Sequence, residues 1–333
     1  MAYIVSPRRL QHIQHNTDAN IRASFLCSQL ILFNSRKKYG LLYSVATIAG
    51  LFCIPGFLNV VGSEIEIQLL IQRIIPAPFI TLMIAVGMYI LNDLVDADLD
   101  KTSLKNRPIP SGRVSKKQAW AFILLTNGGA LGILISTLAI DSIIFVIPMI
   151  LIGILYSTPK KVALMNRFVI KNVAIALFYM LCGMLGISWS HGIELALNNP
   201  IVAIHAITMS GIMIFVGSTV NDLGDIKGDK AAGRRTIPIV LGGENTIKML
   251  IILLVSMPTI SWMLYVIVVE HEIINTIMTP IAVTIVASLA LLRMTRIWKV
   301  FEDMKLMREQ HKKWFPLHIV LQSGMIVGAS LPL

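Results

Sequence analysis

Two short stretches of this sequence gather aspartates at the end of long apolar runs. Residues 92–100, Asn-Asp-Leu-Val-Asp-Ala-Asp-Leu-Asp, place four carboxylates directly after the apolar run 74–91. Residues 221–229, Asn-Asp-Leu-Gly-Asp-Ile-Lys-Gly-Asp, repeat Asn, Asp, Leu, Asp and Asp in the same places 129 positions later. At helical spacing (i, i+3, i+7) three aspartates of each motif share one face: Asp93, Asp96 and Asp100 in the first, and Asp222, Asp225 and Asp229 in the second.

These six carboxylates predict a metal site. Carboxylates on two such faces repel each other unless a cation lies between them. Oxygen ligands suit a hard ion such as Mg²⁺, which proteins usually share with the phosphates of a substrate. The simpler reading is a pair of solvated loops whose acids are balanced by nearby Lys and Arg. The duplication of the motif on one face favours the metal site over that reading.

Basic residues follow both motifs, and part of their pattern is also repeated. Arg-Pro-Ile-Pro at 107–110 matches Arg-Thr-Ile-Pro at 235–238, at an offset of 128. Carboxylates, metal and Arg or Lys side chains together make a diphosphate site. Several of the basic residues, Lys230 among them, have a second explanation as membrane-orientation signals. Because they belong to the repeat, Arg107 and Arg235 are the stronger candidates for binding phosphate.

The composition indicates a membrane protein. Of the 333 residues 55% are hydrophobic and 14% charged, and the mean hydropathy is +0.74. A soluble domain carries about 25% charged residues. The net charge of +11 does not indicate nucleic-acid binding, because the basic residues sit in short connections between apolar runs and are not interleaved with aromatics.

Apolar segments of spanning length recur along the chain and predict an all-α polytopic protein. If the N-terminus is cytoplasmic, the connections on that side hold 28 of the 29 Lys and Arg residues, as the positive-inside rule expects. The nine predicted spans are 40–61, 74–91, 118–138, 142–157, 168–190, 200–220, 246–268, 273–292 and 314–332.

This topology predicts how the chain is organised. Residues 1–39 form a cytoplasmic or interfacial arm, and residues 40–333 form one transmembrane domain in the plasma membrane. Four spans separate the motifs, so the loops 92–117 and 222–245 both face the cytoplasm. The two copies are then parallel repeats, an arrangement in which a site forms where the halves meet.

The sequence resembles the UbiA superfamily of intramembrane prenyltransferases. The resemblance is carried by residues 92–100 with Asn-Arg-Pro-Ile-Pro-Ser-Gly at 106–112, and by residues 222–229 with Gly233, Thr236 and Pro238 behind them. It implies about nine transmembrane helices around a central cavity, capped by the motif loops. It also implies that two or more Mg²⁺ ions bind a prenyl diphosphate and assist ionisation of its allylic C–O bond.

The resemblance assigns roles to individual residues. It implies that Asn92, Asp93, Asp96 and Asp100 hold one ion, and that Asp222, Asp225 and Asp229 hold the other, with Asp93, Asp96, Asp222 and Asp225 as the catalytic set. Asp98 is left out because Lys227 takes its place in the second copy. The diphosphate ligands expected are Arg107, Tyr156, Lys160, Lys171, Lys230 and Arg235, although Tyr156, Lys160 and Lys171 could equally be interfacial anchors.

The expected reaction is transfer of a prenyl group, geranylgeranyl by this resemblance, to a lipid-soluble acceptor within the bilayer. The stretch 106–112 is similar to archaeal members that act on geranylgeranylglyceryl phosphate, an ether lipid, and this is the acceptor we favour. The same stretch is also similar to members that act on quinone precursors or chlorophyllide, which are the alternative. A cation-coupled transporter is the alternative class, but its acids would lie near the midplane of the membrane. A CDP-alcohol phosphotransferase would need Gly, Ala and Arg between the aspartates, which this chain lacks.

Overall fold

The computed structural model describes residues 7–53, 72, 74–98, 107–158, 163–198, 200–270 and 277–330. Two predicted site residues, Asp100 and Lys160, lie outside these ranges. The described part is helical and contains no strand. The long helices are α1 (Pro7–Phe52), α4 (Pro76–Val95), α6 (Lys116–Ser136), α7 (Ile143–Ser157), α8 (Phe168–Asn198), α9 (Pro200–Leu223), α12 (Gly243–Glu270), α13 (Met278–Val300) and α15 (Phe315–Ser330).

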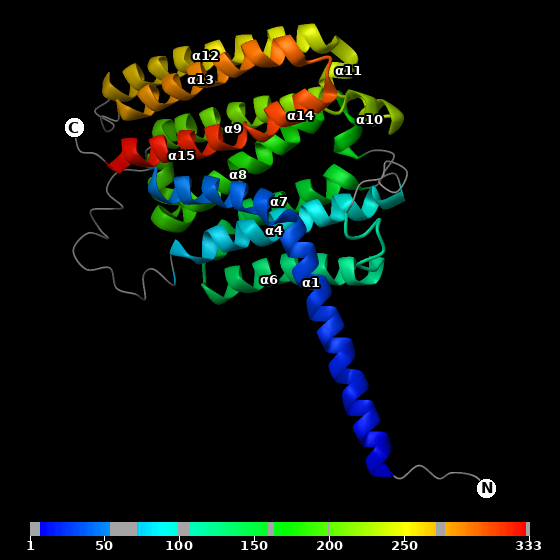
Figure 1. Ribbon diagram of the computed structural model, residues 1–333. Coiled ribbons are helices and arrows are strands. Elements are labelled where there is room, and N and C mark those ends of the chain that lie inside the picture. The colour runs from blue at the N-terminus through cyan, green and yellow to red at the C-terminus, as the bar shows by residue number, and fades with distance from the viewer. Residues whose placement is uncertain are drawn as a thin grey trace.

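The long helices pack side by side and alternate in direction (Figure 1). As a result α4 and α9, which carry the two motifs, run the same way and end at the same end of the bundle. The short helices α10 (Ile226–Ala231), α11 (Ile237–Leu241) and α14 (Met304–Lys312) gather at that end as well. At the opposite end, the 3₁₀ helix η2 (Ile140–Ser142) makes the tight connection between α6 and α7. The two motifs therefore lie at one end of one bundle, as the topology predicts.

The predicted all-helical membrane fold is confirmed. In the described part of the chain seven helices are long and apolar enough to cross a membrane: α4, α6, α7 with η2, α8, α9, α12 and α13. Large apolar side chains point outward from them, for example Leu124 of α6 at 70% exposure and Ile252 of α12 at 67%. Such outward-facing side chains suit contact with lipid. The first and last predicted spans overlap α1 and α15, and the count of nine stays a prediction.

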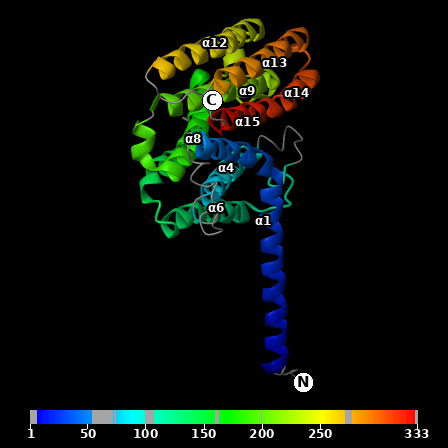
Figure 2. The ribbon, with the colours of Figure 1, turned by 90° about the vertical axis from the view of Figure 1, so that its left-hand side faces the viewer.

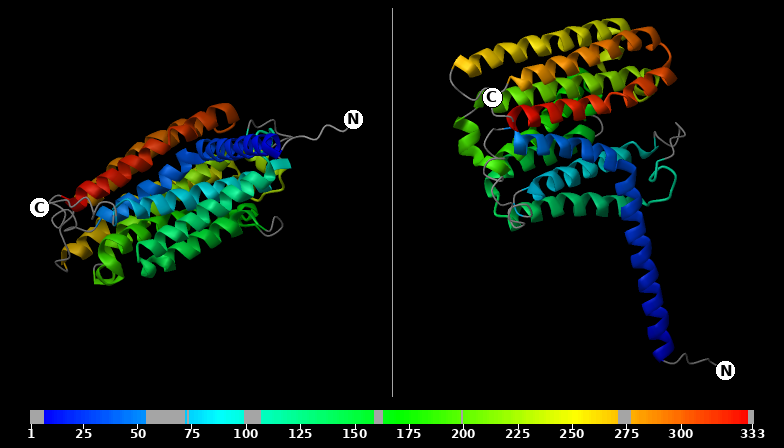
Figure 3. Two further views of the ribbon diagram at one scale, coloured as in Figure 1. Left: turned by 90° about the horizontal axis from the view of Figure 1, so that it is seen from below. Right: turned by 60° about the vertical axis from the view of Figure 1, so that its left-hand side comes forward.

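Helix α1 joins the predicted arm and the first predicted span into one continuous helix. Its N-terminal half projects away from the bundle and runs across the direction of the other helices (Figures 2 and 3). From about Leu32, which is fully buried, α1 enters the core and packs against α4 and α8. A helix that leaves the bundle in this direction suits the interfacial location predicted for residues 1–39, which stays a prediction.

Both motifs contain the end of a helix, so the expectation of one continuous helical face is wrong for Asp222, Asp225 and Asp229. In the first motif α4 ends at Val95, Asp96 is its C-cap, and Asp100 lies outside the described residues. Helix α9 ends at Leu223, and the Gly224 and Asp225 amides make tight turns to Asn221 and Asp222 before α10 begins. Several carboxylates at a helix C-terminus oppose the helix dipole, which disfavours an uninterrupted helix through either motif. In the first motif residues 97–98 are helical again after the turn at Asp96.

Glycines allow α1 and α8 to cross closely. A Cβ on Gly186 of α8 would lie 2.1 Å from the carbonyl oxygen of Thr47, and a Cβ on Gly50 of α1 would lie 2.1 Å from the carbonyl oxygen of Gly183. Backbone atoms cannot move aside as a side-chain tip can. Small residues at such crossings let helices approach within a membrane protein.

Replacing Gly186 by alanine is expected to destabilise the bundle by about 1–3 kcal/mol, because the added methyl group would force α1 and α8 apart. The measurement is thermal unfolding of the purified protein in detergent. Gly132→Ala on α6 is the matched control, since nothing lies within 4 Å of its Cβ position. Equal melting temperatures for the two variants would contradict the close crossing.

Candidate active site

The first motif is held by two arginines. Asp93 is 1% exposed, and the Arg36 guanidinium binds it with two hydrogen bonds, one of them 2.6 Å from Nε to Oδ2. Arg107 Nη1 donates to Asp93 Oδ1 at 2.8 Å. Asp93 therefore lies where α1, α4 and the loop after motif one meet, and Arg107 reaches the motif as predicted.

The second motif is held by a lysine and an asparagine from the start of α8. Lys171 Nζ lies 2.5 Å from Asp222 Oδ1, and Asn172 Nδ2 donates to Asp222 Oδ2 at 3.2 Å. Lys171 is 7% exposed, and a buried ammonium requires a carboxylate partner. Lys171 thus lies beside the second motif, and its predicted role as a diphosphate ligand stays a prediction.

Arg234 joins the two motifs. Its Nη2 binds Asp96 of motif one, and its Nη1 lies 3.3 Å from Asp229 Oδ1 of motif two. Gly233, with φ of +68°, makes the turn after α10, and the Arg234 amide donates to the Asp229 carbonyl at 2.9 Å. Burial lowers the pKa of the Arg234 guanidinium, but the carboxylates of Asp96 and Asp229 outweigh it and hold that pKa above its ordinary value.

The donor set fits Mg²⁺ chemically. Buried or half-buried carboxylates converge from both motifs, and Asp229 Oδ2 has no hydrogen-bond partner among the described residues, although Lys171 Nζ lies 3.8 Å from it. Within the described ranges no three such groups lie close enough to hold a metal together, and Arg and Lys side chains pair with the carboxylates instead. A metal bound with a diphosphate would exchange partners: carboxylates to the metal, and Arg and Lys to the phosphates.

Other predicted ligands lie around this cluster. Asp225 is half-buried at the N-cap of α10, and Gly228 leaves room for its carboxylate, since a Cβ there would lie 2.7 Å from Asp225 Oδ1. The half-buried Asn92 directs Nδ2 toward Ser157 Oγ at 3.5 Å and Met165 Sδ at 3.2 Å. Both residues remain within the motif region as metal-ligand candidates.

Three further predicted diphosphate ligands differ from one another in solvent exposure. Tyr156, at the end of α7, is half-buried. Lys230 and Arg235 have exposed side chains, and the Arg235 amide donates to the Asn166 carbonyl at 3.3 Å. Their roles in binding diphosphate stay predictions.

The structure adds three residues that the sequence reasoning did not select: Arg36, Arg234 and Asn172. Arg234 immediately precedes Arg235, and the match of the two repeats favoured the latter. The feature of the sequence that could have identified Arg36 is its position as a basic residue just before the first predicted span. For Asn172 it was a polar residue next to Lys171 at the start of an apolar run.

Aromatic side chains lie beneath the cluster. The rings of Tyr39 and Tyr89 stack with centroids 4.7 Å apart, and the Arg36 guanidinium lies 5.8 Å and 6.0 Å from them. Tyr43 continues inward to Phe178 at 5.0 Å and Tyr179 at 5.5 Å. Since Tyr89 precedes Asp93 by one helical turn, the aromatic layer begins about 6 Å below the carboxylates.

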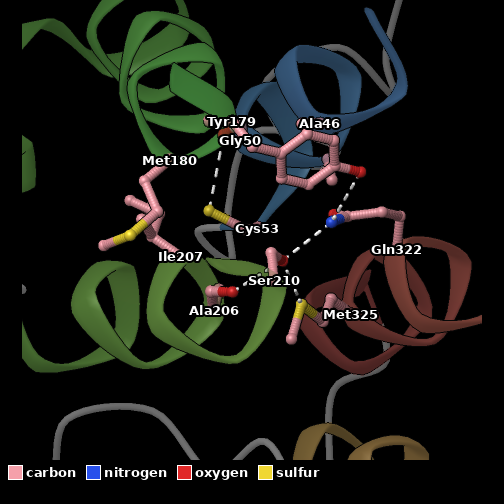
Figure 4. Close-up of a pocket in the computed structure, with 12 residues that line it drawn as sticks. Ala46, Gly50, Cys53, Tyr179, Met180, Ala206, Ile207, Ser210, Gln322 and Met325 are labelled. Carbon is pink, nitrogen blue, oxygen red and sulfur yellow. Dashed lines mark hydrogen bonds between the residues drawn. The ribbon is translucent and has the colours of Figure 1, made fainter. Parts of the chain in front are cut away.

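A small cavity lies deeper, between α1, α8, α9 and α15 (Figure 4). Its walls are mostly apolar, with one polar group in which Gln322 Nε2 donates to Ser210 Oγ at 2.7 Å and approaches the Tyr179 hydroxyl at 3.5 Å. Tyr179 follows Lys171 by eight residues, so the cavity lies about 12 Å below the charged cluster. The charged end and the apolar interior are thus arranged one above the other.

A sequence profile of the UbiA prenyltransferase family matches residues 36–307, which include both motifs and the bundle around them. The chain belongs to this family. It is an integral membrane prenyltransferase, and the recognition, enzyme class and fold predicted from its motifs are confirmed.

Among curated UbiA relatives, digeranylgeranylglyceryl phosphate synthase of Methanoculleus marisnigri is 30% identical over 208 residues, 60% of this chain and 66% of the relative. The synthase of Sulfurisphaera tokodaii is 28% identical over 222 residues, 62% of this chain and 75% of the relative. The matched regions thus span about two thirds to three quarters of these relatives.

Solved structures share the UbiA fold. One, of digeranylgeranylglyceryl phosphate synthase in membranes, has a TM-score of 0.63 at 20% identity and covers 92% of this chain and 98% of its own. Another, a UbiA homologue from Archaeoglobus fulgidus bound to GPP and Mg²⁺, has a TM-score of 0.58 at 16% identity and covers 89% and 99%.

Proposed function

We propose that this protein transfers a geranylgeranyl group from its diphosphate to the hydroxyl of a glyceryl phosphate ether lipid, with Mg²⁺ as the cofactor. The observation that carries this proposal is the cluster in which Arg234 links Asp96 of motif one to Asp229 of motif two. Two separate acidic motifs, each paired with buried or half-buried cations, meet at one end of an apolar bundle.

The charges of the cluster suit a diphosphate. Diphosphate leaves an allylic carbon readily only when its growing negative charge is neutralised, and bound Mg²⁺ would supply much of that neutralisation. The carboxylates of Asp93, Asp96, Asp222, Asp225 and Asp229, with Asn92 and Asp100, are the ligands we assign to the metal. Arg36, Arg107, Lys171 and Arg234 then bind the phosphate oxygens, in company with the predicted Tyr156, Lys160, Lys230 and Arg235.

The interior suits the rest of the donor. An allylic cation must be kept from water, and the aromatic layer beneath the carboxylates consists of the buried Tyr43 and the half-buried Tyr39 and Tyr89. The faces of aromatic rings also stabilise positive charge. The apolar helices below would receive the isoprenoid tail.

The acceptor is proposed from the relatives. Curated proteins that match this chain are named digeranylgeranylglyceryl phosphate synthase, and the stretch 106–112 resembles that branch. We further propose that the protein lies in the plasma membrane with both motifs facing the cytoplasm, where prenyl diphosphates are soluble. The distribution of Lys and Arg supports this orientation.

The deciding experiment uses the purified full-length protein in lipid, with geranylgeranyl diphosphate and three acceptors: geranylgeranylglyceryl phosphate, 4-hydroxybenzoate and a naphthoquinone precursor. Product is expected with the glyceryl phosphate lipid alone. Product with an aromatic acceptor instead would assign the protein to quinone synthesis. Cation flux without transfer would favour the transporter alternative.

Metal and diphosphate are expected to bind cooperatively. Without diphosphate, Mg²⁺ must compete with Arg36, Arg234 and Lys171 for the carboxylates, whereas diphosphate draws these side chains away. Calorimetry should therefore give a Mg²⁺ affinity at least about tenfold higher with a non-hydrolysable geranylgeranyl diphosphate analogue than without it. EDTA should abolish both analogue binding and transfer. Equal Mg²⁺ affinities in the two conditions would contradict the exchange of partners.

A further inference from the structure

A second group of positive charges lies at the same end of the bundle but takes no part in the acidic cluster. It consists of Lys38 on α1 and of Lys312 and Lys313 where α14 ends, and we call it the lysine patch. All three side chains are exposed, and none forms an ion pair within the described part of the chain. Unlike the arginines and lysine beside the motifs, these three lysines thus have no carboxylate within ion-pair distance in the described ranges.

Two interactions tie Lys38 to residues that flank Lys312 and Lys313 in the sequence. Lys38 Nζ lies over the ring of Phe315, 5.1 Å from its centroid, and so ties α1 to the start of α15. His311 lies near enough to respond to the same lysine: burial, and then the positive charge of Lys38, lower the pKa of His311 to about 4. His311 is therefore neutral at pH 7 and can offer a ring N–H as a hydrogen-bond donor.

The patch lies at the depth of the reacting centre. Lys38 follows Arg36 by two residues, a rise of about 3 Å along α1, and Arg36 is bound to Asp93. Apolar side chains continue from the patch toward the middle of the membrane, with Leu41 50% exposed on α1 and Ile319 39% exposed on α15. A lipid whose anionic headgroup sat on the patch would lay its chains along these side chains.

We propose that the lysine patch binds the phosphate of the lipid acceptor and so selects phosphorylated acceptors over neutral ones. A phosphate monoester carries a charge near −2 at pH 7 and three acceptor oxygens, which matches three ammonium groups and one neutral N–H donor. This inference rests on the proposed function, because it supplies the site for that acceptor's headgroup. The acidic cluster binds the diphosphate of the donor, so the two phosphorylated substrates occupy separate groups of cations.

The test compares two acceptors that differ only in the phosphate: geranylgeranylglyceryl phosphate and geranylgeranylglycerol. The variants are Lys38→Met and Lys313→Met, assayed in vesicles of neutral lipid. Each is expected to raise KM for the phosphorylated acceptor about tenfold, in keeping with loss of one charged hydrogen bond. Neither KM for geranylgeranylglycerol nor KM for the donor should change.

Lys248→Met is the matched control, because Lys248 is an exposed lysine near the same end of the bundle that pairs with Glu244 at 2.7 Å. It should leave the preference between the two acceptors unchanged. If Lys38→Met raised KM equally for both acceptors, the patch would be a general lipid contact and the proposal would be overturned. The same conclusion would follow if the rise in KM depended on added phosphatidylglycerol. If both patch variants kept the wild-type preference for the phosphorylated acceptor, the proposal would also be overturned. The proposed function would still hold as long as the wild type transfers the prenyl group.

A measurement on the wild type covers the case in which a variant fails to fold. Raising NaCl from 50 to 500 mM should weaken binding of geranylgeranylglyceryl phosphate by about tenfold or more and leave that of geranylgeranylglycerol nearly unchanged, because salt screens exposed charges. The same salt dependence for both acceptors would rule out a phosphate site on the patch.

Discussion

Replacing Asp222 by asparagine is expected to reduce prenyl transfer at least about a thousandfold. The substitution keeps the shape of the side chain but removes a carboxylate that we assign to the metal. It also leaves Lys171 Nζ, now 2.5 Å from a carboxylate oxygen, facing an amide. Single-turnover transfer would measure the loss, and calorimetry would show whether Mg²⁺-dependent donor binding falls with it.

Asp98→Asn supplies the control from within motif one. The side chain of Asp98 is 78% exposed and its carboxylate lies 3.8 Å from Lys116 Nζ. Exposed pairs of this kind contribute at most about 1 kcal/mol, so transfer by Asp98→Asn should stay within a few fold of wild type. Retention of substantial turnover by Asp222→Asn would remove Asp222 from the metal set. An equal loss of turnover by Asp98→Asn would show that the effect of removing a carboxylate is not specific to the assigned metal ligands.

The repeat in the sequence was enough to predict that the two motifs meet, because four apolar segments between them bring both back to one end of the bundle. It also singled out Asp93, Asp222 and Arg107, whose side chains do enter the cluster. Hydrophobic segments and repeated motifs can both be read directly from the sequence, and both correspond to features of the fold.

Other features depend on geometry that a linear pattern does not contain. The repeat match favours Arg235, yet the turn at Gly233 brings the side chain of Arg234 back to Asp229 and leaves that of Arg235 exposed. A pairing across 138 residues, such as that of Arg234 with Asp96, depends on how the turn after α10 is placed relative to the end of α4. Likewise, the spacing of the aspartates in motif two predicted a continuous helix. Helix α9 instead ends at Leu223 and a turn follows at residues 224–225, where further carboxylates would be unfavourable in a continuing helix.

Replacing Arg234 by methionine is expected to destabilise the metal-free protein by about 3–5 kcal/mol. The change leaves two buried carboxylates, Asp96 at 5% exposure and Asp229 at 2%, without the guanidinium that lies between them. Removing one partner of a buried ion pair typically costs this much, because the other charge stays buried and uncompensated. Thermal unfolding in detergent with EDTA would measure the loss.

Arg235→Met is the matched control for that experiment, since it removes the same charge from the next residue along the chain. Its exposed side chain should contribute only a few tenths of a kcal/mol to stability. Both variants lower the net charge by one, so a difference in stability between them reports the loss of the ion pairs. Excess Mg²⁺ should restore much of the stability of Arg234→Met, because it replaces the lost cation between the carboxylates. If both variants unfolded at the same temperature, or if Mg²⁺ restored neither, Arg234 could not be the link between the two motifs.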